Sequence, residues 1–348
     1  MYPRLTIDLA KLRHNVRTMK QKLDQHGITL VPVTKVFLGL PEMVKIYYEE
    51  GIEMIADSRI ENLERTALPL KKLLVRLPML SQIERVVTSS DAALVSEIAT
   101  IRRIDQTAQR LDKDYEMILM IDLGDLREGV LVTELDEFLS QLPDLKRARF
   151  SGIGTNLTCY GGVLPTEENL TELVACHKKL EDRLGYAVPI ISGGNTSSLY
   201  LLDQGDIPPE INMLRIGEAI VLSRESAMGN TLPGMYTDVF TLEAELIEVK
   251  QKPSLPWGEI GRDAFGEVPN HEDRGLMLRG ILAVGKQDVN YGYLEAPPGV
   301  ELMGASSDHT IVDLKNGAYQ VGDILSFQME YGGLLQLMTS GYVEKVFR

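Results

Sequence analysis

From Leu30 to Leu222 the chain alternates short apolar runs with charged stretches of helical length. The charged stretches, such as Leu40–Glu50 and Glu167–Arg183, are rich in Leu, Ala, Glu and Lys and can form amphipathic helices. Strands that alternate with helices predict βαβ units and a parallel sheet. Eight runs have the character of strands: Leu30–Val33, Glu53–Ala56, Lys72–Leu77, Ala92–Val95, Met117–Ile121, Phe150–Gly154, Val188–Ile191 and Asn212–Ile216. Eight such units predict an α/β fold of the TIM-like (β/α)8 barrel class.

Polar residues stand at or directly after the ends of these runs. Lys35 follows the first run, Asp57 follows the second, Ser192 follows the seventh, and Arg215 lies near the end of the eighth. Barrels of this class place their chemistry at the carboxyl ends of the strands. We therefore predict that the candidate active site lies at that face of the barrel.

After about Ser223 the pattern changes to strand-like alternation interrupted by Gly and Pro, and helical stretches nearly vanish. This change predicts a separate, mainly β domain. The expected strands are Val239–Val249, Leu276–Val284, Thr310–Leu314, Ile324–Met329 and Gly341–Phe347. We expect residues 1–225 to form the barrel and residues 226–348 to form the mainly β domain.

Charge and composition narrow the range of partners. The 50 acidic residues exceed the 36 basic ones in this chain of 348 residues, which leaves a formal net charge of -14. An acidic surface repels phosphates, so we expect no nucleic-acid partner. The longest apolar stretches fall far short of the roughly 20 residues that span a bilayer, so we expect no membrane partner. Two cysteines and the lack of an apolar leader favour a cytoplasmic location.

Two features have the residue types for chemistry. Lys35 ends an apolar strand, and a partly desolvated lysine at a barrel mouth can form a Schiff base with an aldehyde; a solvated lysine at a strand end fits the same position. The segment Ser192–Ser198 combines glycines with hydroxyl side chains and a helix start, which suits a phosphate. A Gly-rich turn with Asn195 or Thr196 as helix cap is compatible with that interpretation. The histidines and cysteines show no metal-ligand spacing, so we expect no metal site.

A lysine ending strand one and a phosphate-type loop after strand seven together resemble the alanine racemase fold (fold type III) of pyridoxal-phosphate (PLP) enzymes. The resemblance looks greatest to the branch of that family that contains ornithine racemase, and it extends along nearly the whole chain. It is carried by the stretches Ala56–Ile60, Asp122–Gly129, Asn156–Gly161, Ser192–Asn195, Lys252–Pro256, Gly304–His309 and Tyr331–Leu335.

The resemblance implies roles for particular residues. Lys35 matches the lysine that holds PLP and acts as one base, and Arg215 matches the arginine that faces the pyridine nitrogen. Arg127 matches an arginine near the phenolic oxygen, and Asn156 stands where the alanine enzymes have a histidine on the cofactor ring. The phosphate is expected at Ser192, Gly193, Gly194, Asn195, Thr196, Ser197, Ser198, Gly217 and Tyr331. An arginine at the pyridine nitrogen keeps that nitrogen unprotonated, which favours racemisation over transamination.

The acid opposite Lys35 is less defined. The alanine enzymes use a partner-subunit tyrosine, and Lys286 stands at the matching position here. Candidates are therefore Lys286, Asp288, Tyr291 and His309, and the predicted catalytic set is Lys35, Lys286 and Asp288. Asp263, Asp288 or Asp308 could bind a substrate ammonium group, and Asp308 and His309 are the predicted substrate contacts.

The resemblance implies PLP-dependent racemisation of a free amino acid, most consistent with ornithine or another basic amino acid. Alternatives are an alanine racemase, a PLP-binding regulatory protein without turnover, and a decarboxylase of the same fold. A homodimer in which the partner's β domain completes each site is also implied.

Overall fold

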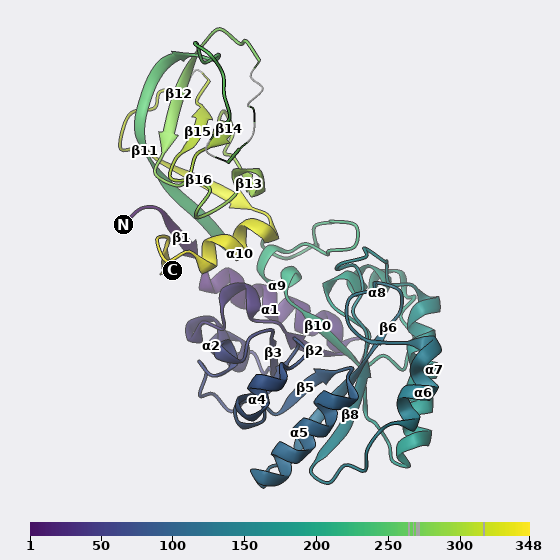
Figure 1. The fold of residues 1–348 in the computed structure, drawn as a ribbon. Helices are drawn as coiled ribbons and strands as arrows, with labels where there is room; N and C mark the ends of the chain where they lie inside the picture. The colour runs from purple at the N-terminus through teal and green to yellow at the C-terminus, as the bar shows by residue number, and fades with distance from the viewer. Residues whose placement is uncertain (264, 267, 269–271, 316) are drawn as a thin grey trace. The chain divides into compact units, whose positions relative to one another are not determined.

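The computed structural model describes residues 1–263, 265–266, 268, 272–315 and 317–348. By its contacts the chain divides into two compact units. One unit is Leu12–Thr237, and the other combines Met1–Lys11 with Asp238–Arg348. Each unit contains its own sheet (Figure 1).

The unit Leu12–Thr237 is built around a parallel sheet with the strand order β2-β10-β9-β8-β6-β5-β4-β3. A bridge between Val33 and Ala56 connects the two end strands, so the sheet is nearly closed and the predicted barrel is confirmed. Each of the eight apolar runs forms one strand of this barrel. The strands are β2 (Thr29–Pro32), β3 (Met54–Asp57), β4 (Lys71–Leu74), β5 (Ala92–Val95), β6 (Tyr115–Asp122), β8 (Ala148–Gly154), β9 (Ile190–Ser192) and β10 (Met213–Ile216), with the short β7 (Val130–Leu131) beside β6.

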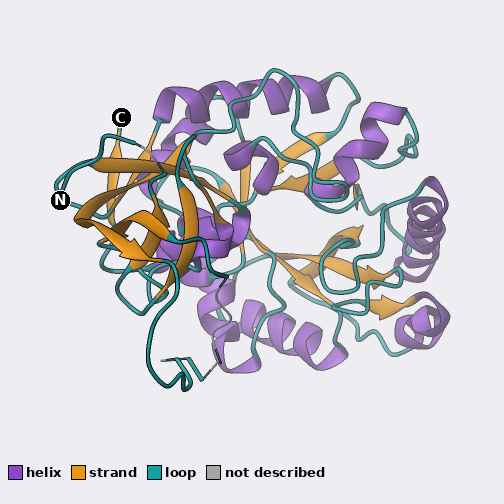
Figure 2. Cartoon of the chain, turned by 90° about the horizontal axis from the view of Figure 1, so that it is seen from above, coloured by secondary structure: helices purple, strands orange, loops and turns teal. Residues whose placement is uncertain are grey.

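Helices lie around the outside of these strands (Figure 2). Local sequence sets their ends: Thr166 and Asn169 form a capping box at the start of α7, and Gly185 ends that helix with φ +70°. The helices are α1 (Leu9–Asp24), α2 (Pro41–Glu49), α3 (Ile60–Leu63), α4 (Ile83–Ser89), α5 (Ile98–Arg110), α6 (Leu135–Ser140), α7 (Glu167–Leu184), α8 (Leu199–Gln204) and α9 (Glu218–Leu222), with 3-10 turns η1 (Lys35–Phe37), η2 (Leu80–Gln82), η3 (Val132–Glu134) and η4 (Thr196–Ser198). None of the helices in the described ranges has both the length and the apolar sequence that a bilayer crossing requires.

Apolar side chains fill the interior of the barrel. The buried cluster consists of Val31, Val33, Ala56, Leu73, Ala92, Leu94, Ile118, Met120 and Met213. Because side chains alternate between the two faces of a strand, these residues identify which positions of each strand point inward.

The second unit is mainly β, and its sheet runs in the order β13-β16-β11-β12-β15-β14, with β1 paired to β11 and β17. Its strands are β1 (Arg4–Ile7), β11 (Phe240–Pro253), β12 (Leu276–Leu282), β13 (Leu294–Glu295), β14 (Glu301–Ala305), β15 (Thr310–Asp313), β16 (Ile324–Met329) and β17 (Glu344–Phe347). The unit also contains the turn η5 (Tyr291–Tyr293) and one helix, α10 (Tyr331–Thr339).

Three features of the two units differ from the sequence-based picture. Residues 1–11, which we expected in the barrel, group with the β unit because β1 pairs with β11 and β17. Residues 226–237, which we expected in the β domain, group with the barrel. The helix α10 was not foreseen because its first turn contains Gly332 and Gly333 and its sequence is apolar rather than amphipathic.

Candidate active site

Inward-facing positions change from apolar to polar toward the carboxyl ends of the strands. Arg215 comes two residues after the core residue Met213, and Lys35 comes two residues after Val33. Ser192 likewise follows Ile190, which packs against the core. The strands that carry these residues, β2, β10 and β9, are direct neighbours. The structure therefore brings the predicted lysine, arginine and Ser192 loop together at one edge of the barrel mouth.

Arg215 is a buried charge of this region, with 3% of its surface exposed. Its guanidinium donates from Nη2 to the carbonyl oxygen of Thr155 over 2.6 Å and from Nη1 to Oγ of Ser192. Both acceptors are neutral. Burial lowers the pKa of Arg215 to about 10, which still leaves the group protonated at pH 7. Arg215 is thus a fixed hydrogen-bond donor inside the mouth.

The loop after β9 has a backbone that side chains would obstruct. Gly194 has φ +112°, and a Cβ there would lie 2.9 Å from Oγ of Ser198. A Cβ on Gly193 would lie 2.6 Å from Ile211. The hydroxyl of Thr196 accepts the N–H of Gly217 at 3.3 Å, which leaves its own hydrogen to donate. The loop therefore combines close backbone approach with a hydroxyl donor, as an anion site needs.

A chain of amide hydrogen bonds orients Asn156. Oδ1 of Asn195 accepts the N–H of Ser197 at 2.7 Å, so its Nδ2 is the donor to Oδ1 of Asn156 at 3.0 Å. This orientation leaves Nδ2 of Asn156 buried and without an acceptor among the described residues. A buried donor without a partner costs on the order of 1–3 kcal/mol. The orphaned donor indicates that a further group belongs at this site.

Arg127 lies in the loop after β6, which neighbours β8. It pairs with Glu128 and donates to Sγ of Cys159. Burial opposes the charge of Arg127, but Glu128, together with the smaller effects of Cys159 and Asp125, raises the pKa of the guanidinium. The charge of Glu128 raises the pKa of Arg215 and the charge of Arg127 lowers it, which connects this loop with the barrel mouth.

These residues fit PLP. The glycine loop and Thr196 suit its phosphate, Arg215 is a permanent donor for a ring nitrogen, and the orphaned Nδ2 of Asn156 needs an acceptor. Lys35 lies partly exposed on the same side of the barrel.

The other predicted site residues lie in the β unit. Two adjacent loops hold four of them, because the N–H of Lys286 donates to Ser306 at 2.9 Å and that of Gln287 donates to Ser307 at 3.1 Å. The ammonium of Lys286 stacks 3.8 Å from the ring centre of Phe265, whereas Asp288 is buried and accepts from Ser340 at 2.6 Å. Asp308 and His309 are exposed, and Tyr331 begins α10.

Sequence reasoning missed two members of the mouth. The backbone carbonyl of Thr155 binds Arg215, and a main-chain acceptor has no signal in a sequence. Asp57 was noted only as a polar residue after its strand. The structure buries it completely and bonds it to Thr34, the residue before Lys35.

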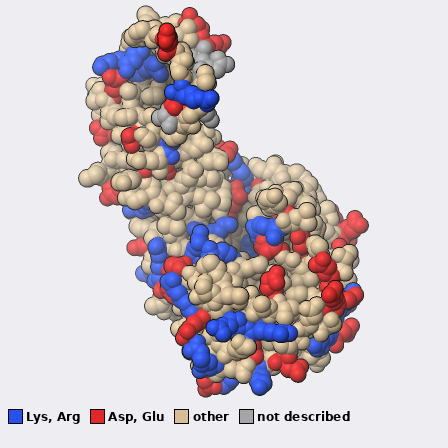
Figure 3. Space-filling view, in the orientation of Figure 1, with Lys and Arg blue, Asp and Glu red and all other residues tan. Residues whose placement is uncertain are grey.

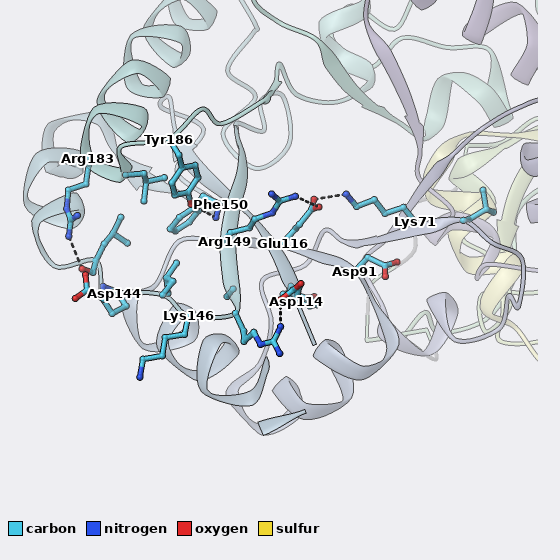
Figure 4. Close-up of a pocket in the computed structure, with 18 of the residues that line it drawn as sticks. Lys71, Asp91, Asp114, Glu116, Asp144, Lys146, Arg149, Phe150, Arg183 and Tyr186 are labelled. Carbon is cyan, nitrogen blue, oxygen red and sulfur yellow. Dashed lines mark hydrogen bonds and ion pairs between the residues drawn. The ribbon is translucent and has the colours of Figure 1, made fainter. Parts of the chain in front are cut away.

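The opposite, amino end of the barrel contains a cavity of about 1070 Å³ (Figure 4). Lys71 and Arg149 both pair with Glu116 there, at 2.6 and 3.2 Å, and Arg147 pairs with Asp114 at 2.9 Å. Basic and acidic side chains also intermingle on the face seen in Figure 3. We interpret this end as an ionic floor of the barrel, because its charges bind one another. No group of three or more His, Cys, Asp or Glu side chains suited to a metal ion occurs among the residues placed by the structure.

Comparison with known proteins agrees with this geometry. The chain is 44% identical over 99% of its length to an ornithine racemase of Acetoanaerobium sticklandii and 40% identical over its whole length to a lysine racemase of Thermotoga maritima, covering 99% of each relative. Its fold matches an alanine racemase of Bartonella henselae with covalently bound pyridoxal phosphate, with a TM-score of 0.74 at 16% identity over 99% of both chains. The family model of the alanine racemase N-terminal domain matches residues 7–225, and the chain therefore belongs to the alanine racemase family.

Proposed function

We propose that this protein is a PLP-dependent racemase of a basic amino acid, with ornithine or lysine as its substrate. The observation that carries the proposal is the barrel mouth, where a buried, permanently protonated Arg215 lies on the strand next to the one that leads to Lys35. The relatives named above, which act on ornithine and on lysine, support the choice of substrate.

Each residue of the mouth has a distinct task. PLP, when bound, supplies an electron-withdrawing ring that acidifies the Cα–H bond of an amino acid. Lys35 would hold the cofactor through Nζ and remove or return the Cα proton on one face. Arg215 would donate to the pyridine nitrogen, Arg127 to the phenolic oxygen and Asn156 to the ring region. The phosphate would bind at Ser192–Ser198 and Gly217, with Tyr331 from the β unit.

A proton on the opposite face needs a second group. Lys286 and Asp288 are the proposed donors, and of the two Lys286 is the more exposed, because Asp288 is buried against Ser340. Asp308 and His309, on the neighbouring loop, are the proposed contacts for the substrate side chain. We propose further that the protein acts as a homodimer in which the partner's β unit completes the site.

The test is a panel of single L-amino acids incubated with the PLP-loaded protein in deuterated solvent and analysed by chiral chromatography and mass spectrometry. We expect ornithine and lysine to be racemised faster than alanine, with solvent deuterium at Cα. Equal rates for alanine and ornithine would contradict the substrate class. Release of carbon dioxide would identify a decarboxylase, and bound PLP without turnover would identify a regulatory protein.

The variant Lys35→Ala tests the role of Lys35 as the cofactor lysine. We expect it to abolish both covalent cofactor binding and racemisation, because Lys35 is the one lysine in the segment of residues 28–40 that contains β2 and the turn after it. Lys146→Ala is the control, since Lys146 is an exposed lysine at the floor of the same barrel. A Lys35→Ala protein that keeps the cofactor covalently attached would refute the role of Lys35.

A further inference from the structure

Asp57 is a fully buried carboxylate that none of the roles above uses. It ends β3, and its oxygens accept hydrogen bonds from Oγ1 of Thr34 at 2.6 Å, from the N–H of Arg59 at 2.8 Å and from Nδ2 of Asn62 at 3.0 Å. These donors are a hydroxyl, a backbone N–H and an amide, all of them neutral. Burial raises the pKa of Asp57, while these hydrogen bonds act in the opposite direction. A buried carboxylate held by neutral donors is costly, so its place requires an explanation.

The position of Asp57 in the barrel explains why a carboxylate is buried there. Asp57 lies beside the seam where β2 and β3 close the ring, and the bridge of Val33 to Ala56 is the only ladder contact there among the described strands. Just beyond it, the N–H of Thr34 donates to the carbonyl of Ala56 at 2.8 Å. β2 has already ended at Pro32. On the other side, the N–H of Val33 donates to the carbonyl of Ile216 at 2.8 Å, and after Thr34 the chain that leads to Lys35 leaves the sheet.

Thr34 organises the turn that carries Lys35. It is fully buried and precedes η1, and its carbonyl accepts the N–H groups of Phe37 and Gly39, both at 3.2 Å. Its side chain makes no capping bond within the turn and is bonded to Asp57 instead. The carboxylate thus holds the residue from which the whole turn is built.

Asn62 holds the far end of the same turn. The turn closes through Leu38 and Gly39, which have φ of +58° and +61°. A Cβ on Gly39 would lie 2.7 Å from the carbonyl oxygen of Asn62, so the turn packs directly against α3. The side chain of Asn62 donates to Asp57. One carboxylate therefore connects both ends of the turn to β3 and α3.

We propose that Asp57 is the positioning residue for Lys35: it fixes the Lys35 turn through Thr34 and Asn62 and so sets the place of the amine. This inference rests on the proposed role of Lys35 as the cofactor lysine. The clamp acts by hydrogen-bond geometry rather than by charge, because its donors are neutral.

Three variants of the PLP-loaded protein test it. Asp57→Asn keeps the clamp, since the new amide can donate to Oγ1 of Thr34, whose hydrogen then turns to the carbonyl of Ala56 at 3.3 Å. Asp57→Ala and Thr34→Val remove it. Thr107→Val, at a buried threonine of α5 outside the mouth, is the matched control.

Two readouts are followed: kcat and KM for ornithine, and the midpoint pH of the visible absorption of the bound cofactor. We expect Asp57→Ala and Thr34→Val to lower kcat about ten- to a hundredfold with little change in KM. We also expect them to shift the midpoint by at least about half a pH unit. Asp57→Asn and Thr107→Val should resemble the unaltered protein in both respects. A merely structural carboxylate would change the melting temperature and leave the midpoint in place.

The possible outcomes distinguish a failure of this inference from a failure of the proposed function. If Asp57→Ala and Thr34→Val keep the original kcat and midpoint, the inference is overturned while the proposed function stands. If Asp57→Asn changes both readouts as much as Asp57→Ala does, charge and not the clamp acts, and the inference is again overturned. If Asp57→Ala does not fold, Thr34→Val decides, because it removes a single hydroxyl. Absence of a cofactor band in the unaltered protein would overturn the proposed function itself.

Discussion

The two ends of the barrel use charged side chains in different ways. At the mouth, Arg215 and Asp57 are buried and are bonded to neutral hydroxyl, amide and carbonyl groups. At the floor, Glu116 and Arg149 belong to ion pairs that are partly open to solvent. Different strands of one barrel carry the two arrangements: β10 and β3 at the mouth, and β6 and β8 at the floor.

The difference separates groups that bind a ligand or position the residues that do, at the mouth, from groups that bind one another, at the floor. A buried charge held by neutral partners keeps its capacity to bind a ligand, but it destabilises the fold through desolvation. Exposed ion pairs contribute little energy and leave no capacity for a ligand. This contrast locates the chemistry at the carboxyl ends of the strands, although a sizeable cavity lies at the other end.

The largest expected effect contrasts one arginine from each end. Arg215→Ala leaves Ser192 and Thr155 without their donor and should cost about 3 kcal/mol of stability. It should also lower racemase activity at least about a hundredfold. Arg149→Ala, at a side chain that is 68% exposed, should cost less than about 1 kcal/mol and leave activity unchanged. Urea unfolding measures the stability of each variant, and a racemisation assay measures its activity. Equal losses of stability and activity in the two variants would contradict the difference between the two ends of the barrel.

Asp105 tests whether a floor residue can affect stability without affecting chemistry. One of its oxygens accepts the N–H groups of Lys146, Arg147 and Ala148 at 2.8–2.9 Å, which fixes the start of β8. Asp105→Ala should lower the free energy of unfolding by about 2–3 kcal/mol. The kcat of the folded protein, measured at about 20 °C, should stay unchanged. A loss of kcat in the folded variant would contradict the assignment of Asp105 to stability alone.

Two glycines with positive φ distinguish backbone strain from a site effect. Gly194→Ala and Gly205→Ala both place a Cβ on left-handed backbone, at φ +112° and +82°, and each should cost about 1–2 kcal/mol. Only the Cβ at residue 194 meets a site atom, Oγ of Ser198. We therefore expect PLP affinity, measured by fluorescence titration, to fall about tenfold in Gly194→Ala alone. A similar fall in Gly205→Ala would count against the phosphate loop.

The smallest expected effect is a pH dependence at the floor. Burial alone would raise the pKa of Glu116, but the hydrogen bond and charge of Lys71, together with the smaller effects of Ser151 and Arg149, hold that pKa below its ordinary value. The folded state therefore favours the carboxylate, and this stabilisation is present at neutral pH and is lost as the pH falls below the ordinary glutamate range. Glu116→Gln should reduce the acid-induced loss of stability by about 1 kcal/mol or less, as urea midpoints at pH 7 and pH 4 would reveal. An unchanged difference between the two pH values would contradict the ion-pair assignment.

Much of the mouth was predictable from local sequence. Apolar runs followed by polar residues identified the strands and their carboxyl ends, so Lys35, Arg215 and the Ser192 loop were found where the structure places them. The bonds among them were not predictable. Thr155 binds Arg215 through its main chain, and Asp57 meets Thr34 across 23 positions of sequence.

The sequence by itself determined the eight-strand pattern, the polar character of the strand ends and the change to a mainly β region, because each of these is a local periodicity of side chains. Only the tertiary structure decided that β1 joins the C-terminal sheet, that the ring closes at Val33 and Ala56, and that Asp57 holds the turn of Lys35. These depend on which distant segments meet, and burial then gives each such contact its energy.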